Sequence, residues 1–170
     1  MNCAKGHDLA IVEVGGTVGD IESQPFLEAI RQMKLELGGN RALFAHLTLI
    51  PYLASSGEIK TKPTQHSIKN LLSHGIQADL LICRSENTLH KNDSKKIALF
   101  TNVQEECVFT IPDVESIHSI PELLNSQGLD RQVTEKLRLK SKRANLSRWK
   151  KVTKLEKNRK GKTKIAMVGK

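Results

Sequence analysis

The sequence predicts an α/β fold in which helices flank a parallel sheet. Two observations support this prediction. Apolar runs of strand length alternate with segments whose apolar residues recur at helical spacing. In addition, a chain of 170 residues with 38% hydrophobic and 26% charged residues can bury the core of one globular domain. We therefore expect a core formed where the helices pack on the sheet.

Four apolar runs in the first two thirds of the chain are predicted strands: residues 9–14, 43–50, 80–83 and 107–111. Near the end of the sequence, residues 163–168 (TKIAMV) are predicted to form one more strand, followed by Gly169-Lys170. No later segment offers this strand a partner, so we expect it to open a further domain.

Helices are predicted between the strands. The first carries apolar residues at helical spacing and ends at Gly38-Gly39; these residues are Phe26, Ile30, Met33 and Leu37. Three more are predicted over residues 63–74, ended by Gly75, around 94–100, and over 121–127. Residues beyond 130 are Lys- and Arg-rich helix-like segments with the only tryptophan, Trp149, followed by a loop over 157–162.

The positive charge is confined to the last quarter of the chain. Residues 1–130 contain 11 Lys or Arg and 16 Asp or Glu, a net −5, whereas residues 131–170 contain 16 and 2, a net +14. We interpret the basic part as a solvated linker, and do not expect nucleic acid as a partner, because no RNA-binding motif accompanies the charge. Binding of RNA or acidic surfaces through this tail is the alternative function.

Cysteine and histidine patterns exclude several classes of site. Cys3, Cys83 and Cys107 are odd in number and widely spaced, so neither disulfides nor zinc are indicated. No histidine has a catalytic spacing to a Ser or Cys, and His46, inside an apolar run, is predicted to be a core residue while His66 lies on a helix surface. No apolar run is long enough for a membrane span, and we expect a cytoplasmic protein.

A Gly-rich turn over residues 13–23 (EVGGTVGDIES) joins a predicted strand to a predicted helix. Ligands of open α/β sheets bind at this kind of edge. Glu13, Asp20 and Glu22 place three carboxylates around the turn, which favours a magnesium site because clustered carboxylates repel each other unless a cation neutralises them. The alternative is a solvated turn whose acidic residues face a helix N-terminus.

A second loop, residues 57–67 (GEIKTKPTQHS), also leads into a helix N-terminus, where N–H groups favour anions. The segment is suited to binding a triphosphate, because it has two cations, three polar side chains and a proline that restricts the backbone. These residues are Lys60, Lys62, Thr61, Thr64, Gln65 and Pro63. Ordinary surface lysines at a helix start are the alternative. Arg84 and Lys96 follow the third strand, and we expect all these loops to face one pocket; for Lys96 the alternative is a solvated helix face.

Seven segments together resemble the CTP synthase family in order and spacing: EVGGTVGDIES with PFLEAIRQ, HLTLIPYL, GEIKTKPTQHSIK, GIQADLLICRS, KKIALFTNV, IPELLNSQGLD and KIAMVGK. The resemblance implies a P-loop-NTPase-like parallel sheet with flanking helices. It also implies a ligase that uses ATP to phosphorylate the uracil O4 of UTP, after which ammonia from glutamine displaces phosphate to give CTP, in pyrimidine biosynthesis.

The resemblance also implies site residues. Glu13 corresponds to a Mg²⁺ ligand. Contacts to UTP and to the feedback inhibitor CTP are implied for Asp20, Ile21, Glu22, Lys60, Thr61, Lys62, Pro63, Thr64, Gln65 and Lys96. An ATP base-binding turn is implied for Pro112, Asp113 and Val114, mainly through backbone groups, although Pro112 has no N–H to offer. No residue is assigned a catalytic role.

The chain also departs from the family pattern. It has no Gly-rich phosphate loop with its lysine, no first strands, no second magnesium carboxylate and no cysteine-dependent glutaminase domain. We expect residues 1–130 to be a partial synthetase domain, 131–162 a basic helical segment and linker, and 163–170 the first strand of a missing glutaminase domain. We expect such a chain to be inactive alone and poorly stable. The resemblance implies that the complete protein would form homotetramers.

Overall fold

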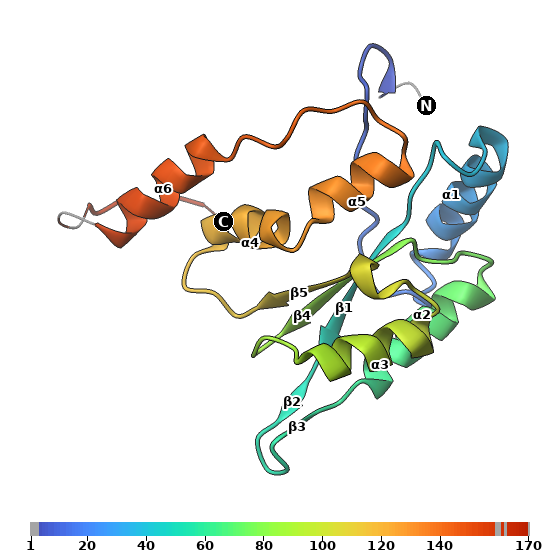
Figure 1. The fold of residues 1–170 in the computed structure, drawn as a ribbon, viewed down its shortest axis with the longest axis horizontal. Coiled ribbons are helices and arrows are strands. Elements are labelled where there is room, and N and C mark those ends of the chain that lie inside the picture. The colour runs from blue at the N-terminus through green and yellow to red at the C-terminus, as the bar shows by residue number, and fades with distance from the viewer. Residues whose placement is uncertain (1–3, 159–160, 162, 170) are drawn as a thin grey trace.

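A three-stranded parallel sheet lies at the centre of the molecule in the computed structural model, which describes residues 4–158, 161 and 163–169 (Figure 1). The strands are β1 (Ala45–Ile50), β4 (Leu80–Ser85) and β5 (Val108–Pro112), in the order β1-β4-β5. Helices flank the sheet, so the predicted α/β class is confirmed. The predicted strands 43–50, 80–83 and 107–111 correspond to these three elements.

The register of the sheet sorts its side chains onto two faces. Thr48, Cys83 and Thr110 are paired across the three strands, and so are Leu47, Ile82 and Phe109. Because neighbouring residues of a strand point to opposite faces, these two rows mark the two sides of the sheet.

One face is covered by two helices that lie in front of the sheet in Figure 1, α2 (Lys62–Ser73) and α3 (Lys91–Thr101). Ile68 of α2 and Ile97 of α3 are almost fully buried with Leu81 of β4 in the core. Burying a branched aliphatic side chain contributes about 2 kcal/mol. Packing of these apolar stripes on the sheet therefore fixes both helices.

The other face is covered only over β5, by α4 (Ile120–Ser126) and α5 (Leu129–Lys136). Between these helices, the amide of Gln127 accepts a hydrogen bond from the Thr110 N–H and donates one to the Thr110 carbonyl oxygen, both at 2.8 Å. This side chain completes the backbone bonding of β5 as a neighbouring strand would. The helix predicted over 121–127 is thus confirmed as α4.

Helix α1 (Gln24–Leu37) has Pro25 in its first turn and ends at Gly38, whose φ of 82° few other residues adopt. Its Lys34 binds Asp79 at 2.8 Å, and Asp79 also accepts a hydrogen bond from the Phe44 N–H at 2.8 Å. This side-chain contact explains why β1 begins at Ala45 and not at residue 43 as predicted.

Several short elements were not predicted. A hairpin of β2 (Tyr52–Leu53) and β3 (Glu58–Ile59) extends from the end of β1 (Figure 1). By contrast, α6 (Ser147–Lys157), which lies apart from the sheet, corresponds to the basic helix-like segment expected around Trp149. Two 3₁₀ turns, η2 (Glu105–Cys107) and η3 (Ile117–Ser119), flank β5, so Cys107 precedes the strand instead of opening it. Helix α3 begins at Lys91, earlier than residue 94.

Two predicted strands are absent. Residues 9–14 and 163–168 have no regular secondary structure and are largely exposed, with Ile11 89% and Val168 99% accessible. Strand-like composition alone forms no strand, because the backbone needs a neighbour to bond with, and neither segment pairs with another in the described structure. Lys170, and Lys162 of the predicted loop 157–162, lie outside the described residues, as do residues 159–160.

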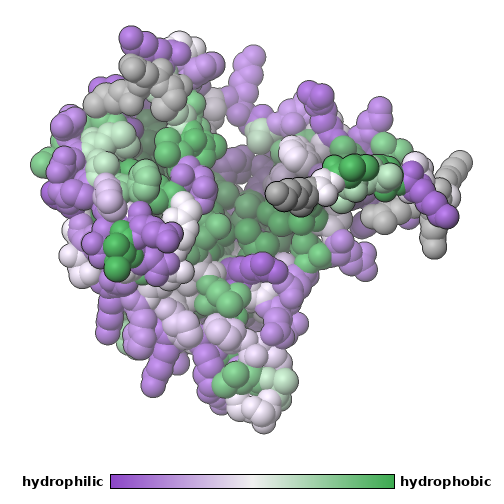
Figure 2. Space-filling model, turned by 180° about the vertical axis from the view of Figure 1, so that it is seen from behind, coloured by the Kyte–Doolittle hydropathy of each residue, from purple (hydrophilic) through white to green (hydrophobic). Residues whose placement is uncertain are grey.

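The face of β1 that points away from α2 is open to solvent. Leu47 is 69% and Leu49 57% exposed. Figure 2, seen from behind, shows apolar side chains gathered in a hollow at the centre of that side of the molecule. No helix among the described residues has the length and apolar character that crossing a bilayer requires.

Candidate functional site

The Gly-rich turn of residues 13–23 is closed by its own hydrogen bonds. The carboxylate of Asp20 accepts from the Thr17 N–H at 3.1 Å, and the Ser23 hydroxyl donates to the carbonyl oxygens of Asp20, at 2.9 Å, and Thr17, at 3.3 Å. Ser23 is buried, whereas Asp20, Ile21 and Glu22 are exposed. The predicted nucleotide contacts of this turn are therefore accessible.

The same turn is anchored to α2. The amide of Asn70 donates to the Val18 carbonyl oxygen at 2.7 Å, and Gly19, at φ 105°, passes so close that an added Cβ would lie 2.1 Å from the amide nitrogen. Only glycine fits this approach. Asn70 is eight residues beyond Lys62, or roughly 12 Å along the helix. The turn and the second loop therefore contact different parts of α2, and the expectation that they face one pocket stays a prediction.

The three carboxylates of the turn do not form a metal site by themselves. Glu13, Asp20 and Glu22 are all exposed, and the described residues contain no group of three or more potential metal-ligating side chains. A protein-only magnesium site is therefore not supported. One protein carboxylate is enough where a nucleotide's phosphates supply the other ligands, so Glu13 fits that more limited role.

The second loop leads from the β2-β3 hairpin into α2, as predicted. Thr61 precedes the helix and is mostly buried, and its hydroxyl accepts from the Gln65 amide at 3.1 Å. No side chain caps the first turn of α2, which has Pro63 near its start. Pro63 has no N–H, Thr64 is buried, and the Gln65 N–H bonds the Thr61 carbonyl oxygen, so the start of α2 offers an anion the exposed Lys62 and its N–H.

Thr64 has a different role from the predicted one. It is fully buried, donates its hydroxyl proton to the Leu49 carbonyl oxygen at 3.2 Å, and accepts from the Thr48 hydroxyl at 3.0 Å. These bonds hold α2 against the end of β1. The buried hydroxyl of Thr64 is therefore not accessible to a ligand in this structure. The sequence predicted where α2 begins, but it did not show which side of the helix packs against the sheet.

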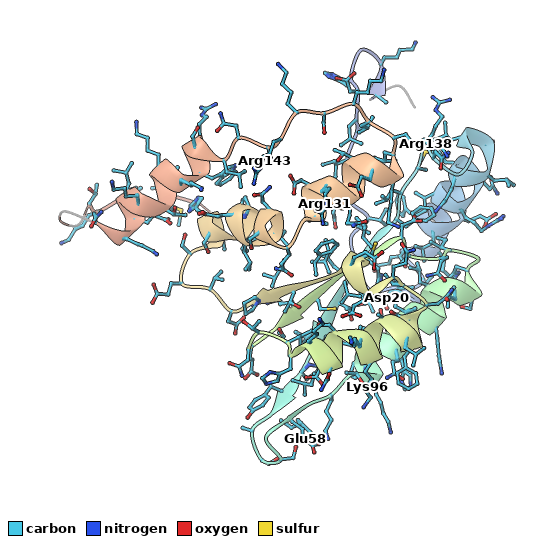
Figure 3. The ribbon with its side chains drawn as sticks, in the orientation of Figure 1. Asp20, Glu58, Lys96, Arg131, Arg138 and Arg143 are labelled. Carbon is cyan, nitrogen blue, oxygen red and sulfur yellow. The ribbon has the colours of Figure 1, made fainter. Side chains whose placement is uncertain are left out.

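A carboxylate that was not singled out from the sequence links two predicted cations. Glu58 binds Lys60 at 2.9 Å, and Lys60, through its hydrogen bond and charge, together with the nearby charge of Lys96, holds the Glu58 pKa below its ordinary value. Lys60 comes from the second loop and Lys96 from α3. Glu58 and Lys96 lie at the hairpin end of the molecule in Figure 3. Lys60 is thus paired with Glu58, and the charge of Lys96 also acts on that carboxylate.

The predicted ATP turn follows β5 at the same carboxyl edge of the sheet. Arg84 of β4 lies 3.6 Å from the Asp113 carboxylate, and the Asp113 N–H donates to the Glu86 carbonyl oxygen at 3.4 Å. β1 and β5 are two strand spacings apart, or roughly 10 Å. The second loop and residues Pro112–Val114 therefore lie on one edge of the sheet without touching.

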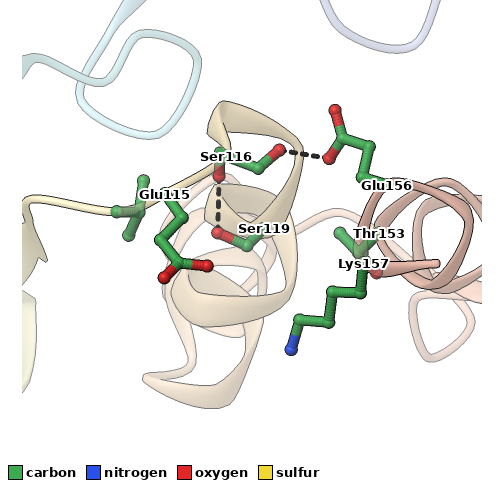
Figure 4. Close-up of a pocket in the computed structure, with 7 residues that line it drawn as sticks. Glu115, Ser116, Ser119, Thr153, Glu156 and Lys157 are labelled. Atoms are coloured by element: carbon green, nitrogen blue, oxygen red, sulfur yellow. Dashed lines mark hydrogen bonds between the residues drawn. The ribbon is translucent and has the colours of Figure 1, made fainter. Parts of the chain in front are cut away.

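A pocket of about 630 Å³ adjoins this turn (Figure 4). Its walls come from the segment after β5 and from α6; the lining residues are Val114, Glu115, Ser116, Ser119, Thr153, Glu156 and Lys157. Glu156 accepts a hydrogen bond from Ser116 and pairs with His118 at 2.8 Å. Of the predicted site residues, only Val114 lines this pocket.

The comparison with known families agrees with this arrangement. A family model described as CTP synthase N-terminus matches residues 1–139 of the chain. The chain belongs to the CTP synthase family. The matched part contains the sheet, its helices α1 to α5 and every predicted site residue. Helix α6, which builds one wall of the pocket, lies beyond the matched region.

Proposed function

We propose that this chain takes part in the ATP-dependent amination of UTP to CTP and holds the triphosphate shared by UTP and CTP. The observation that carries the proposal is the pair of lysines at the uncapped start of α2, Lys60 just before the helix and exposed Lys62 in its first turn, with Lys96 as a further cation of the site. Two cations beside the N-terminal end of a helix dipole suit a phosphate chain. Family membership supplies the identity of the nucleotide.

The ATP base would lie against the turn Pro112–Val114, with the adjoining pocket as the space available to it. Val114 belongs to both. When bound, Mg²⁺ would offset charge on the nucleotide phosphates, and Glu13 is the carboxylate proposed to contact it. In this chain the residues named here bind and orient nucleotides, and none of them is proposed to transfer a proton.

Isothermal titration of the whole chain with UTP in the presence of Mg²⁺ tests the triphosphate site. We expect K60Q/K62Q to weaken binding by about tenfold, because two charge-assisted contacts are lost. The matched control is K69Q, since Lys69 is an exposed lysine of the same helix. We expect no measurable binding of uridine, which has no phosphate, to the chain or to any variant.

Two results would contradict this proposal. One is an absence of UTP binding by the unaltered chain, and the other is equal weakening by K69Q and K60Q/K62Q. A separate assay with ATP, UTP, Mg²⁺ and ammonia tests catalytic competence. Because the sequence has no Gly-rich phosphate loop, we expect no CTP to form, and CTP formation would show that the remaining residues suffice.

A further inference from the structure

Helix α6 is the regular element in the basic part of the chain, whereas residues 139–146, which connect it to α5, have no regular secondary structure. Helix α6 packs through one side on the segment that follows β5 and on α4. Trp149 contacts the His118 ring at a centroid distance of 6.1 Å, Lys150 pairs with Glu122 at 3.4 Å, and Glu156 pairs with His118. Trp149, Thr153 and Glu156 are spaced by four and three residues and so share the inner side of the helix.

The opposite side of the helix carries its remaining charge. Arg148, Lys151 and Lys154 recur every third residue and are all exposed. The connection from α5 to α6 runs along the outside of the molecule in Figure 1 and adds three more exposed cations. We call these six residues the basic ridge: Lys140, Lys142, Arg143, Arg148, Lys151 and Lys154.

The basic ridge is nearly free of neutralising charge. Between residues 138 and 157 the only acidic residue is Glu156, which is on the inner side and engaged with Ser116 and His118. No ion pair is formed by any ridge residue within the described structure; the ion pairs of this part of the chain use Lys150, Arg131 and His118. The cations are therefore available to an external anion.

The length of the ridge favours a polymer over a free nucleotide. Residues 140–147 span up to about 26 Å when extended, and Arg148 to Lys154 adds about 9 Å of helix, so the ridge spans at most about 35 Å. The ridge is also remote from Glu58 and its partner Lys60, since Arg143 and Glu58 lie at opposite ends of Figure 3. Six cations over this distance match a run of phosphates.

The apolar residues near the cations of the basic ridge indicate which kind of anion it would bind. Helices that lie in a lipid surface bury a wide apolar side, with tryptophan among its residues. Here Trp149 packs against His118, and the exposed apolar side chains of α6, Val152 at 37% and Leu155 at 63%, lie between cations and do not form a wide apolar side. The net −5 of residues 1–130 would also repel a polyanion from the rest of the surface and so confine it to the ridge.

We propose that the basic ridge binds the phosphate backbone of single-stranded RNA without sequence preference. Each phosphate neutralised by a cation releases counterions, so the affinity falls with salt. With six contacts, the logarithm of the binding constant should fall with the logarithm of salt concentration with a slope of about −4. This interaction is separate from nucleotide binding at Lys60 and Lys96.

Fluorescence anisotropy of the whole chain with a labelled mixed-sequence RNA of about 30 nucleotides, between about 50 and 300 mM salt, tests the proposal. We expect R148Q/K151Q/K154Q to weaken binding at least about tenfold at the lowest salt and to reduce the slope by about 2. The control K69Q/K91Q/K95Q removes the same charge from exposed positions on α2 and α3. It should leave the slope unchanged.

Circular dichroism of each variant verifies that the fold is retained, as expected for exposed positions. Absence of binding by the unaltered chain at the lowest salt would overturn the proposal. So would equal weakening by the two triple variants, which would indicate a response to net charge alone. Tighter binding to phosphatidylserine vesicles than to RNA would assign the ridge to a membrane surface instead.

Discussion

At the residue scale, Glu58 competes with any anion for Lys60 and Lys96. Its carboxylate is exposed, and Lys60 and Lys96 hold its pKa down, so it is charged at neutral pH. Replacing it by glutamine removes a negative charge from the proposed triphosphate site. We expect E58Q to bind UTP about threefold more tightly by titration calorimetry, a modest gain because the pair is solvent-exposed.

The control for this prediction is E36Q, an exposed glutamate of α1 with the same change in net charge. Weaker UTP binding by E58Q would show that Glu58 positions Lys60 for the ligand and does not compete with it.

His46 gives the protein a specific dependence of stability on pH. Its ring nitrogen Nε2 lies 2.8 Å from the Ser67 hydroxyl, and burial lowers its pKa from the ordinary value of 6.5. The unfolded chain therefore binds the proton more readily than the folded chain. The contribution to stability is complete above pH 6.5 and is lost as pH falls from 6.5 toward the lowered folded pKa.

Urea unfolding at several pH values between neutral and mildly acidic pH measures this effect. We expect the free energy of unfolding to decline below pH 6.5 in the unaltered chain and to decline less in H46N. An identical decline in H46N would assign the pH dependence to other groups.

At the element scale, α6 depends on a few polar contacts because its inner side buries little apolar surface. Glu156 bonds both Ser116 and His118, and its side chain is 25% exposed. Losing charge-assisted bonds of this kind costs about 1 to 3 kcal/mol. We expect E156Q to release α6 and expose Trp149, which should shift its fluorescence to longer wavelength and speed amide exchange within the helix.

The control for α6 is E135Q, because Glu135 is an exposed residue of α5 that pairs with exposed Arg131 at 4.0 Å. Unchanged Trp149 fluorescence in E156Q would mean that the contacts of Trp149 and Lys150 hold the helix without Glu156.

At the scale of the whole molecule, the open sheet surface should promote self-association. Parallel sheets are normally covered on both faces, and β1 is an edge strand with Leu47 and Leu49 exposed. We expect concentration-dependent association of the chain in sedimentation velocity, and we expect L47K/L49K to reduce it. The control L99K alters a leucine of α3 that is 79% exposed, and should leave association unchanged. A chain that is monomeric at all concentrations would contradict this prediction.

The sequence by itself determined the α/β class, three of the strands and the helices between them. The reason is that apolar periodicity and Gly or Pro boundaries are local signals, and β1, β4, β5 and α1 to α4 follow them closely. It also determined that the second loop would lead into a helix start, since Pro63 after two lysines marks that boundary.

Only the tertiary structure decided how these elements are used. Residues 9–14 have the composition of a strand but lack a neighbour, and strand formation depends on pairing that no local pattern encodes. Thr64 lies in a loop-to-helix segment typical of anion binding, yet the packing of α2 on β1 turns its hydroxyl inward. The meeting of Lys60, Glu58 and Lys96 likewise depends on contacts between separate elements, because charges distant in sequence interact only when the fold brings them together.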